Sequence, residues 1–141
     1  GKIAFVWSIL KRLRRYRRTE FSMTVEGEDG ISERRAASAV ATKARFYAGR
    51  FVLAPAARLG DRSFQLALFR RGGRGVALGY LLALAGGFLH RLRHVEIATA
   101  RTARFTLPRG APVQIDGDVI GHLPVTIRIA QAPLLLVHPG A

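Results

Sequence analysis

The sequence has no cysteine, one methionine and one tryptophan among its 141 residues. Without cysteine there is no disulfide framework, thiolate metal ligand or thiol nucleophile, and the chain suits a reducing compartment. Acidic residues are also scarce, because nine Asp and Glu stand against 23 Lys and Arg, for a net charge of +14. That charge predicts attraction to an anionic partner, and it leaves phospholipid headgroups, nucleic acid and phosphorylated substrates open.

Long hydrophobic runs are missing as well. The longest apolar stretch, Val76–Leu89, is interrupted by glycines and falls short of the roughly 18–20 residues that cross a bilayer. The first residues do not have the order of a secretory signal, because the apolar stretch precedes the basic one. We therefore expect one domain with a hydrophobic core, located in the cytoplasm and peripherally at the membrane.

Two helices are predicted from apolar residues at three- and four-residue spacing, over Ile3–Arg17 and Val76–Arg91. The first ends in a basic cluster, Lys11–Arg18. This helix could lie on anionic lipid through an amphipathic face, or pack on its own domain with a solvated basic end. We favour packing, because the basic residues form one terminal block rather than one face.

Phe21–Val25 and Ser63–Phe69 are predicted as strands because apolar and polar residues alternate along them. The small residues of Arg34–Phe46 could form a helix, but we interpret this segment as a strand that pairs with the first across a glycine-rich turn. Between later turn signals, the predicted strands are Val95–Ala100, Thr102–Leu107, Val125–Ile129 and Leu134–Val137. The segment Phe46–Ala57 predicts a loop that follows a fixed path, and Arg70–Gly75 a flexible basic loop without the spacing of a phosphate-binding loop. Strands at this spacing indicate a sandwich or a barrel. We expect a mainly β (α+β) fold, an antiparallel β-sandwich with two helices.

A β-hairpin is predicted over Val113–Gly121, where apolar residues flank an Asp-Gly dipeptide. Gly117 would supply the positive φ of the tight turn, which would carry Asp116 and Asp118. Most such turns are purely structural. However, these two acids and Asp61 are the ones placed at turns between apolar strands. Two or three carboxylates can hold Mg²⁺, and one can act as a general base for a hydroxyl.

Other chemistries find little support. His90 and His94 are four residues apart but lie at a basic helix end, a poor place for Zn²⁺ ligands. No serine lies in a Gly-x-Ser-x-Gly elbow. The aromatic residues occupy mostly strand-like or apolar positions, so we interpret them as core rather than as a surface for nucleic-acid bases.

The order of several short elements resembles the C-terminal domain of the diacylglycerol kinase family, which includes bacterial lipid kinases, sphingosine kinases and ceramide kinases. The elements are Tyr47-Ala48-Gly49, Leu53–Ala57, Asp61, a strand, a leucine-rich helix, Val113–Asp118 and Val137-His138-Pro139. The family carries similar runs of Tyr-x-Gly-Gly, a proline-alanine segment, Asp-Asp-Gly-x-Leu-Asp and Gln-x-Asp-Gly-Glu. The N-terminal Gly1–Phe5 is similar to the start of the helix that opens that domain, so the resemblance covers essentially the whole chain.

This resemblance implies an NAD-kinase-like two-domain architecture, with residues 1–141 as the lipid-substrate domain. It implies transfer of the γ-phosphate of ATP, with Mg²⁺, to a hydroxyl of diacylglycerol or a similar lipid. In the family ATP is bound mainly by an N-terminal domain with a Gly-Gly-Asp-Gly-Thr motif, which this sequence lacks, so the chain alone is expected to be inactive. The implied partners are the lipid substrate, ATP, that N-terminal domain and an anionic membrane surface. Nucleic acid is not expected, and a homodimer is left open.

The resemblance also assigns roles to the acids. Asp118 falls where the family has the glutamate of Asp-Gly-Glu, the candidate base, and Asp116 falls on the neighbouring aspartate. Asp61 matches an aspartate of a metal-associated loop. The chain departs from the family pattern at Gly60, Arg62, Gln65 and Asp118 itself. Because Asp is one methylene shorter than Glu, the base would move by about 1 Å, which can cost on the order of a hundredfold in rate. The alternative is a non-catalytic domain that binds lipid or anionic membrane.

Overall fold

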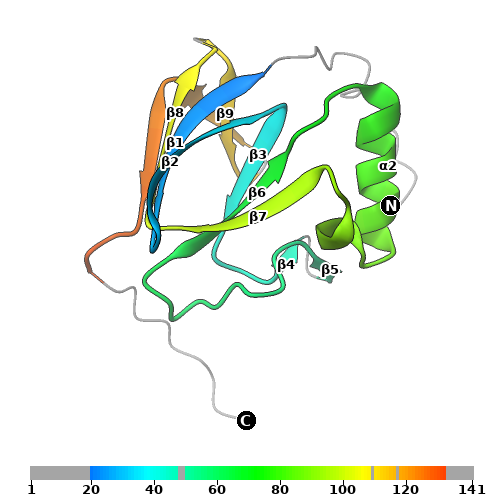
Figure 1. Cartoon of the computed structure of the whole chain (residues 1–141), viewed down its shortest axis with the longest axis horizontal. Helices are drawn as coiled ribbons and strands as arrows, with labels where there is room; N and C mark the ends of the chain where they lie inside the picture. Colours follow the sequence, from blue (N-terminus) through cyan, green and yellow to red (C-terminus); the bar gives the residue numbers. More distant parts are fainter. Residues whose placement is uncertain (1–19, 48–49, 109, 117, 133–141) are drawn as a thin grey trace.

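The computed structural model describes residues 20–47, 50–108, 110–116 and 118–132 (Figure 1). The first predicted helix, Ile3–Arg17, and the last predicted strand, Leu134–Val137, lie outside these residues. Within the described part, all strand pairs are antiparallel. The two larger sheets form the expected β-sandwich, and no helix of the described part is long and apolar enough to cross a bilayer.

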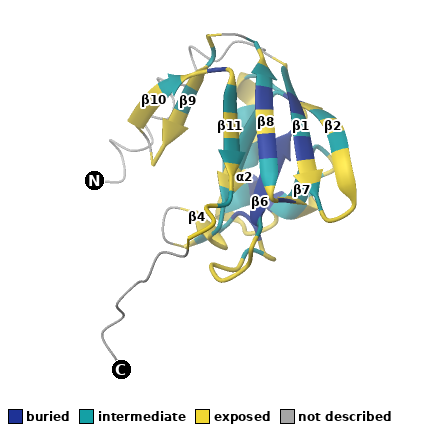
Figure 2. Ribbon diagram, turned by 90° about the vertical axis from the view of Figure 1, so that its left-hand side faces the viewer, coloured by how far each residue is buried: buried dark blue, intermediate teal, exposed yellow. Residues whose placement is uncertain are grey.

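The first sheet has the strand order β11-β8-β1-β2. Its strands are β1 (Phe21–Gly27), β2 (Gly30–Ala36), β8 (Thr102–Leu107) and β11 (Val125–Arg128). Alternate residues of β1 and β8 point inward, so that Met23, Val25, Ala103 and Phe105 are buried while their neighbours in sequence are not (Figure 2). The half-buried alternation predicted for Phe21–Val25 is therefore confirmed in β1, and β8 shows the same alternation.

The second sheet has the order β3-β6-β7, with β3 (Ser38–Thr42), β6 (Phe64–Phe69) and β7 (Val95–Ala100). Every residue of β6 is buried. Leu66 and Leu68 join the core between the two sheets, whereas Ala67 and Phe69 join a second core on the opposite face.

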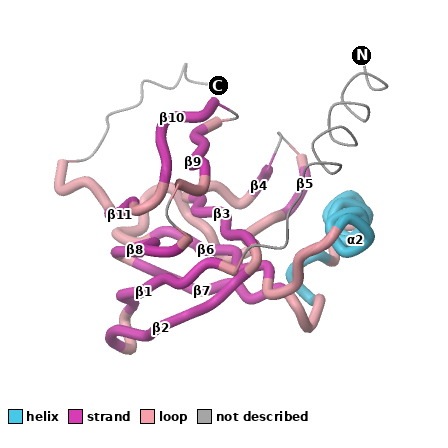
Figure 3. Tube along the Cα trace, turned by 90° about the horizontal axis from the view of Figure 1, so that it is seen from above, coloured by secondary structure: helices cyan, strands magenta, loops and turns pink. Residues whose placement is uncertain are grey.

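Helix α2 (Arg74–Ala85) covers that opposite face (Figure 3). Ala83 is buried in the second core, and the ring of Tyr80 lies 5.0 Å from that of Phe69. The molecule thus has three layers, with β6 in the middle one. The predicted helix Val76–Arg91 was too long at its C-terminal end, because α2 stops at Ala85. Gly87 adopts a φ of 76° after the C-cap, a conformation that glycine tolerates and that ends helices.

The helix is followed by the 3-10 turn η1 (Leu89–Arg91), which contains buried Leu89. The helix also begins inside the segment that was predicted as a flexible loop, since α2 starts at Arg74. Residues 70–75 are all glycine or arginine and carry no apolar periodicity, so the sequence pattern did not mark this start.

One predicted strand was wrong. Residues 34–46 do not form a single strand, because the chain leaves the first sheet after Ala36 and enters the second sheet at Ser38. Ala37 stands at the crossing, and its N–H donates to the carbonyl of Phe69 at 2.7 Å. Alternation continues through the small residues at the crossing, so the sequence alone does not reveal the change of sheet.

Two short ladders complete the fold. The predicted loop Phe46–Ala57 contains β4 (Phe46–Tyr47) paired with β5 (Phe51–Val52). The predicted Asp-Gly hairpin is confirmed as β9 (Pro112–Ile115) paired with β10 (Asp118–His122). The remaining predicted strands agree with β6, β7, β8 and β11 to within one residue at each end.

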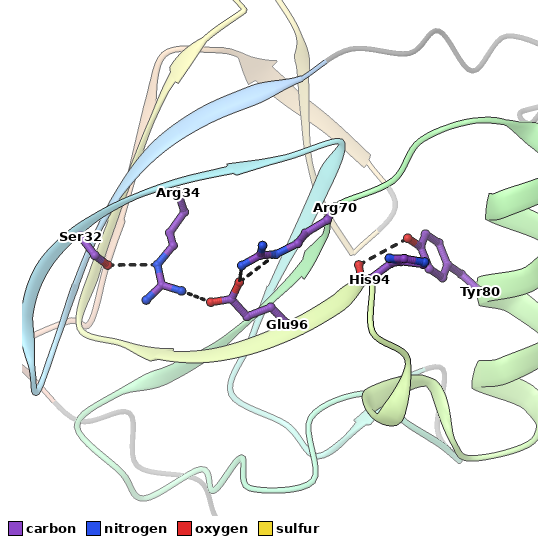
Figure 4. Close-up of polar contacts among 6 residues, drawn as sticks. All are labelled: Ser32, Arg34, Arg70, Tyr80, His94 and Glu96. Carbon is purple, nitrogen blue, oxygen red and sulfur yellow. Dashed lines mark hydrogen bonds and ion pairs between the residues drawn. The ribbon is translucent and has the colours of Figure 1, made fainter.

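The open edges of the two sheets are joined by an ion-pair cluster (Figure 4). Arg34 of edge strand β2 donates to Glu96 of edge strand β7. The Nη2 of Arg70 lies 2.5 Å from the other carboxylate oxygen of Glu96. The side chain of Glu96 is only 22% exposed, so these contacts tie the sheets together at a partly buried position. Sequence reasoning missed this cluster, because its three members are far apart in the chain.

Candidate functional site

The tip of the β9–β10 hairpin carries two of the predicted acids. Ile115 pairs with Asp118, so Asp116 lies in the tight turn that joins β9 to β10. Asp116 has a φ of 51°, as the first central residue of the turn type favoured in such hairpins does. The predicted positive φ at Gly117 lies outside the described residues. Both Asp116 and Asp118 are exposed.

The base of this hairpin is fixed to the core between the sheets. Leu123 is buried there, and Ala111 and Val113 pack against the same cluster. The N–H of Leu123 donates to the carbonyl of Ala111 at 2.8 Å. A two-stranded ladder alone is only marginally stable in water, so the anchored base holds the turn in position.

The hairpin that carries the two acids also exposes large apolar residues. Ile115, Val119 and Ile120 are each 57–58% exposed. Ile115 lies directly opposite Asp118 across the ladder, and Val119 follows it along β10. The tip therefore combines carboxylates with exposed aliphatic surface, which the sequence pattern of flanking apolar residues did not distinguish from buried strand positions.

Asp61, the third predicted acid, lies in the connection between β5 and β6, three residues before Phe64. It is exposed. Its backbone carbonyl accepts a hydrogen bond of 2.6 Å from Nζ of Lys43, and its N–H donates to the carbonyl of Arg58 at 3.3 Å. These contacts fix the path of the backbone and leave the carboxylate at the surface.

The structure brings Asp116 and Asp118 together at one turn, and it places Asp61 on a separate segment. In Figure 1 the hairpin lies in the upper part of the molecule, and the connection between β5 and β6 runs along the bottom. Among the described residues, no three His, Asp or Glu side chains gather to hold a metal ion. Mg²⁺ is commonly held by one or two carboxylates together with phosphate oxygens and water. Asp61 could supply one such ligand.

The departures from the family pattern have different surroundings. Gln65 is buried at 6% exposure, and its side-chain amide donates to the Thr99 hydroxyl at 3.0 Å. The buried amide of Gln65 therefore has a hydrogen-bond partner inside the fold. Gly60 faces open space, because a Cβ added there would meet no atom within 4 Å, so nothing in the described part of the fold requires glycine at this position. Arg62 is exposed.

A shallow hollow of about 350 Å³ lies between β1, β2 and β8. Its lining includes Ser22, Thr24, Glu33, Arg35 and Thr106. None of the three candidate acids lines it, so this hollow does not extend the predicted site.

The arrangement of layers defines the class of protein: a two-sheet β-sandwich domain with a helix packed on one sheet. The chain belongs to the family described as the YegS C-terminal NAD kinase beta sandwich-like domain, whose profile matches residues 1–138. This membership confirms the family resemblance drawn from the order of motifs. No curated protein matches the chain.

Two solved structures share the fold. Both are described as "a putative diacylglycerol kinase from Bacillus anthracis str. Sterne". One has a TM-score of 0.55 at 13% sequence identity, over 84% of this chain and 40% of that chain. The other has a TM-score of 0.54 at 11% identity, over 84% and 41%. The chain thus spans about two fifths of the length of these proteins.

Proposed function

We propose that this chain is the lipid-acceptor part of an ATP-dependent lipid kinase. The acceptor would be diacylglycerol or a similar lipid with a free hydroxyl. Membership of a lipid-kinase domain family supports this proposal. The observation that carries it in the structure is the position of Asp118, an exposed carboxylate directly across the ladder from the exposed aliphatic side chain of Ile115. A lipid alcohol needs a base for its hydroxyl and apolar contacts for its chains.

The proposed reaction divides its parts between two domains. The acceptor oxygen bonds to the γ-phosphorus of ATP, the bond from that phosphorus to the bridging oxygen breaks, and ADP leaves. Asp118 accepts the hydroxyl proton, and Asp116 shapes the turn that holds it. ATP would be bound mainly by an N-terminal domain that this sequence does not include. When bound, Mg²⁺ would neutralise charge on the phosphates. Its ligands would come mainly from the ATP-binding domain, because Asp61 lies on a segment apart from the hairpin that carries Asp118. Positioning of these parts supplies most of the rate in phosphoryl transfer.

Substitution of the proposed base tests this function. In the protein that joins this chain to its ATP-binding domain, Asp118→Asn should lower turnover about 10²–10⁴-fold, the range for loss of a general base. The melting temperature should stay within about 2 °C, because the side chain is exposed. Lipid phosphorylation with radiolabelled ATP measures the first quantity, and thermal unfolding by circular dichroism measures the second.

The matched control is Asp29→Asn, which removes an exposed carboxylate from the turn between β1 and β2. This variant should keep full turnover. Asp118→Glu restores the residue type of the family and should retain activity. If Asp118→Asn turns over lipid as fast as the unsubstituted protein, Asp118 is not the base.

The second candidate is a non-catalytic domain that attaches to anionic membrane. The departures at Gly60, Arg62 and Gln65 favour it, since Gln65 now serves the interior of the fold. In that case the protein phosphorylates no lipid, with or without a substitution at Asp118. Binding to anionic vesicles weakens as salt rises, because the charges are screened.

A further inference from the structure

An exposed aromatic and basic surface surrounds the short β4–β5 ladder. Phe46 and Tyr47 are 50% and 51% exposed. The interpretation of the aromatic residues as core is therefore wrong for these two, whereas Phe64, Phe69 and Phe105 are buried as expected. The guanidinium carbon of Arg45 lies 5.6 Å from the centroid of the Phe46 ring, and that of Arg50 lies 5.2 Å from the Phe51 ring. These distances fall within the range of cation–π contacts. We call the set Lys43, Arg45, Phe46, Tyr47, Arg50 and Phe51 the β4–β5 surface.

The backbone beneath this surface is fixed to the fold. Tyr47 pairs with Phe51, and Phe46 pairs with Val52. The carbonyl of Arg45 accepts hydrogen bonds from the N–H groups of Leu53 and Ala54, at 3.1 and 3.4 Å. Leu53 is buried in the second core. The aromatic rings are therefore exposed on an anchored ladder rather than on an unattached loop.

The local charge is strongly positive. Residues 43–62 contain five basic residues and one acidic residue, Asp61. Nζ of Lys43 donates to the Asp61 carbonyl, so the β4–β5 surface directly adjoins the candidate metal-associated segment. In the same connection, Leu59 is 68% exposed. Positive charge and aromatic rings lie together here, and the adjoining connection adds an exposed aliphatic side chain.

Amphipathic aromatic rings sit at the headgroup level of membranes, and arginines beside them attract anionic lipids. We propose that the β4–β5 surface docks on the headgroup region of an anionic lipid bilayer. The exposed leucine favours a bilayer over single-stranded nucleic acid, which needs flat rings that are free for stacking. Here the guanidinium groups of Arg45 and Arg50 already lie against two of the rings.

This inference rests on the proposed function, in which the acceptor is itself a membrane lipid. Seen from above, β4, β5, β9 and β10 lie along the same side of the molecule (Figure 3). A bilayer that contacts the β4–β5 surface therefore faces the side on which the hairpin carries Asp118. Docking would present the acceptor from the membrane without its full extraction into water.

Vesicle sedimentation tests the surface with charge-matched variants of the 141-residue chain. Arg45→Gln with Arg50→Gln removes two charges from the β4–β5 surface, and Arg35→Gln with Arg104→Gln removes two exposed charges from the first sheet. With vesicles of phosphatidylglycerol and phosphatidylcholine, the first pair should weaken binding about twenty-five-fold, since each basic residue near the surface contributes about a factor of five. The second pair should weaken it less than threefold. Equal losses in both pairs would overturn the proposal.

The aromatic contribution is tested separately. Phe46→Ser with Tyr47→Ser should lower vesicle affinity at least tenfold, because two half-exposed rings no longer enter the interface. The control Ile31→Ser removes the most exposed large aliphatic side chain, on β2, and should leave affinity unchanged. Melting temperatures confirm that each variant folds. If the aromatic pair loses binding to single-stranded RNA but not to vesicles, the surface binds nucleic acid and the membrane proposal is wrong.

Turnover separates failure of docking from failure of the kinase function. In the protein joined to its ATP-binding domain, Arg45→Gln with Arg50→Gln should lower turnover of acceptor in anionic vesicles far more than turnover in neutral detergent micelles. Equal turnover loss in vesicles and micelles would contradict docking. If the unsubstituted protein phosphorylates no lipid but its vesicle binding still depends on Arg45 and Arg50, the kinase function fails and the docking surface stands.

Discussion

Strand β6 and the β9–β10 hairpin are both rich in apolar residues, yet β6 is buried and the hairpin is mostly exposed. All six residues of β6 are buried, whereas in β9 and β10 only Val113 and Gly121 are even half-buried. β6 has a strand on each side and a covered surface on each face. Within the described residues, the hairpin has one ladder and no further strand. Stability is therefore concentrated in the middle layer, and the candidate chemistry lies where little stability depends on the side chains.

The largest effect is expected inside β6. Leu66 is fully buried between the sheets, so Leu66→Ala should lower the free energy of unfolding by about 2–5 kcal/mol through lost burial and a cavity. Ile115→Ala, at the exposed tip of the hairpin, should change it by less than about 0.5 kcal/mol. Urea denaturation measures both. Similar losses at the two positions would mean that the tip of the hairpin is covered in solution.

A smaller effect is expected at the ion-pair cluster on the open edge of the sandwich. Glu96→Gln leaves Arg34 and Arg70 with a neutral partner, and it should cost about 1–2 kcal/mol of unfolding free energy after allowance for the exposure of both arginines.

The control for that cluster is Glu28→Gln. Its carboxylate lies 3.8 Å from Arg101, and both side chains are mostly exposed, so the expected change is under about 0.5 kcal/mol. Chemical denaturation of the two variants in parallel decides whether the edge cluster differs from an ordinary surface pair. Equal changes in the two variants would show that the edge cluster contributes no more than an ordinary surface ion pair.

The smallest effect is expected at the hairpin turn. Asp116 has a φ of 51°, in the left-handed region that alanine adopts less readily than aspartate or glycine. Asp116→Ala should cost about 1 kcal/mol, and Asp116→Gly should be close to neutral. Thermal unfolding of both variants measures the difference. A stable alanine variant would show that the turn relaxes to another conformation and does not hold Asp118 in place.

Part of the fold could be predicted because its signals are local. Alternation over Val95–Ala100 and Thr102–Leu107 marks β7 and β8, and the Asp-Gly dipeptide marks the hairpin. The crossing at Ala37 could not be predicted, because small residues there satisfy either sheet and the choice depends on the Phe69 carbonyl. The end of α2 depends on Gly86 and Gly87. The leucine-rich pattern continues beyond these glycines, so the sequence predicted a longer helix.

The candidate site shows the same division. Turn chemistry and the order of motifs pointed to Asp116 and Asp118, and those signals are local. The exposed rings of Phe46 and Tyr47 were interpreted as core, because an aromatic residue in a strand has the same pattern whether or not another layer covers it. The Glu96 cluster joins residues that only the meeting of two sheet edges brings together.

The sequence by itself determined which segments extend, where the tight hairpin turns, and the strong positive charge, because backbone preference and charge belong to the residues. Only the tertiary structure decided which apolar segments lie inside and which face solvent. Burial depends on what covers a segment, and for β6 the covering layers come from β1, β8 and α2. That is why similar apolar strands form the core in one place and frame an exposed carboxylate in another.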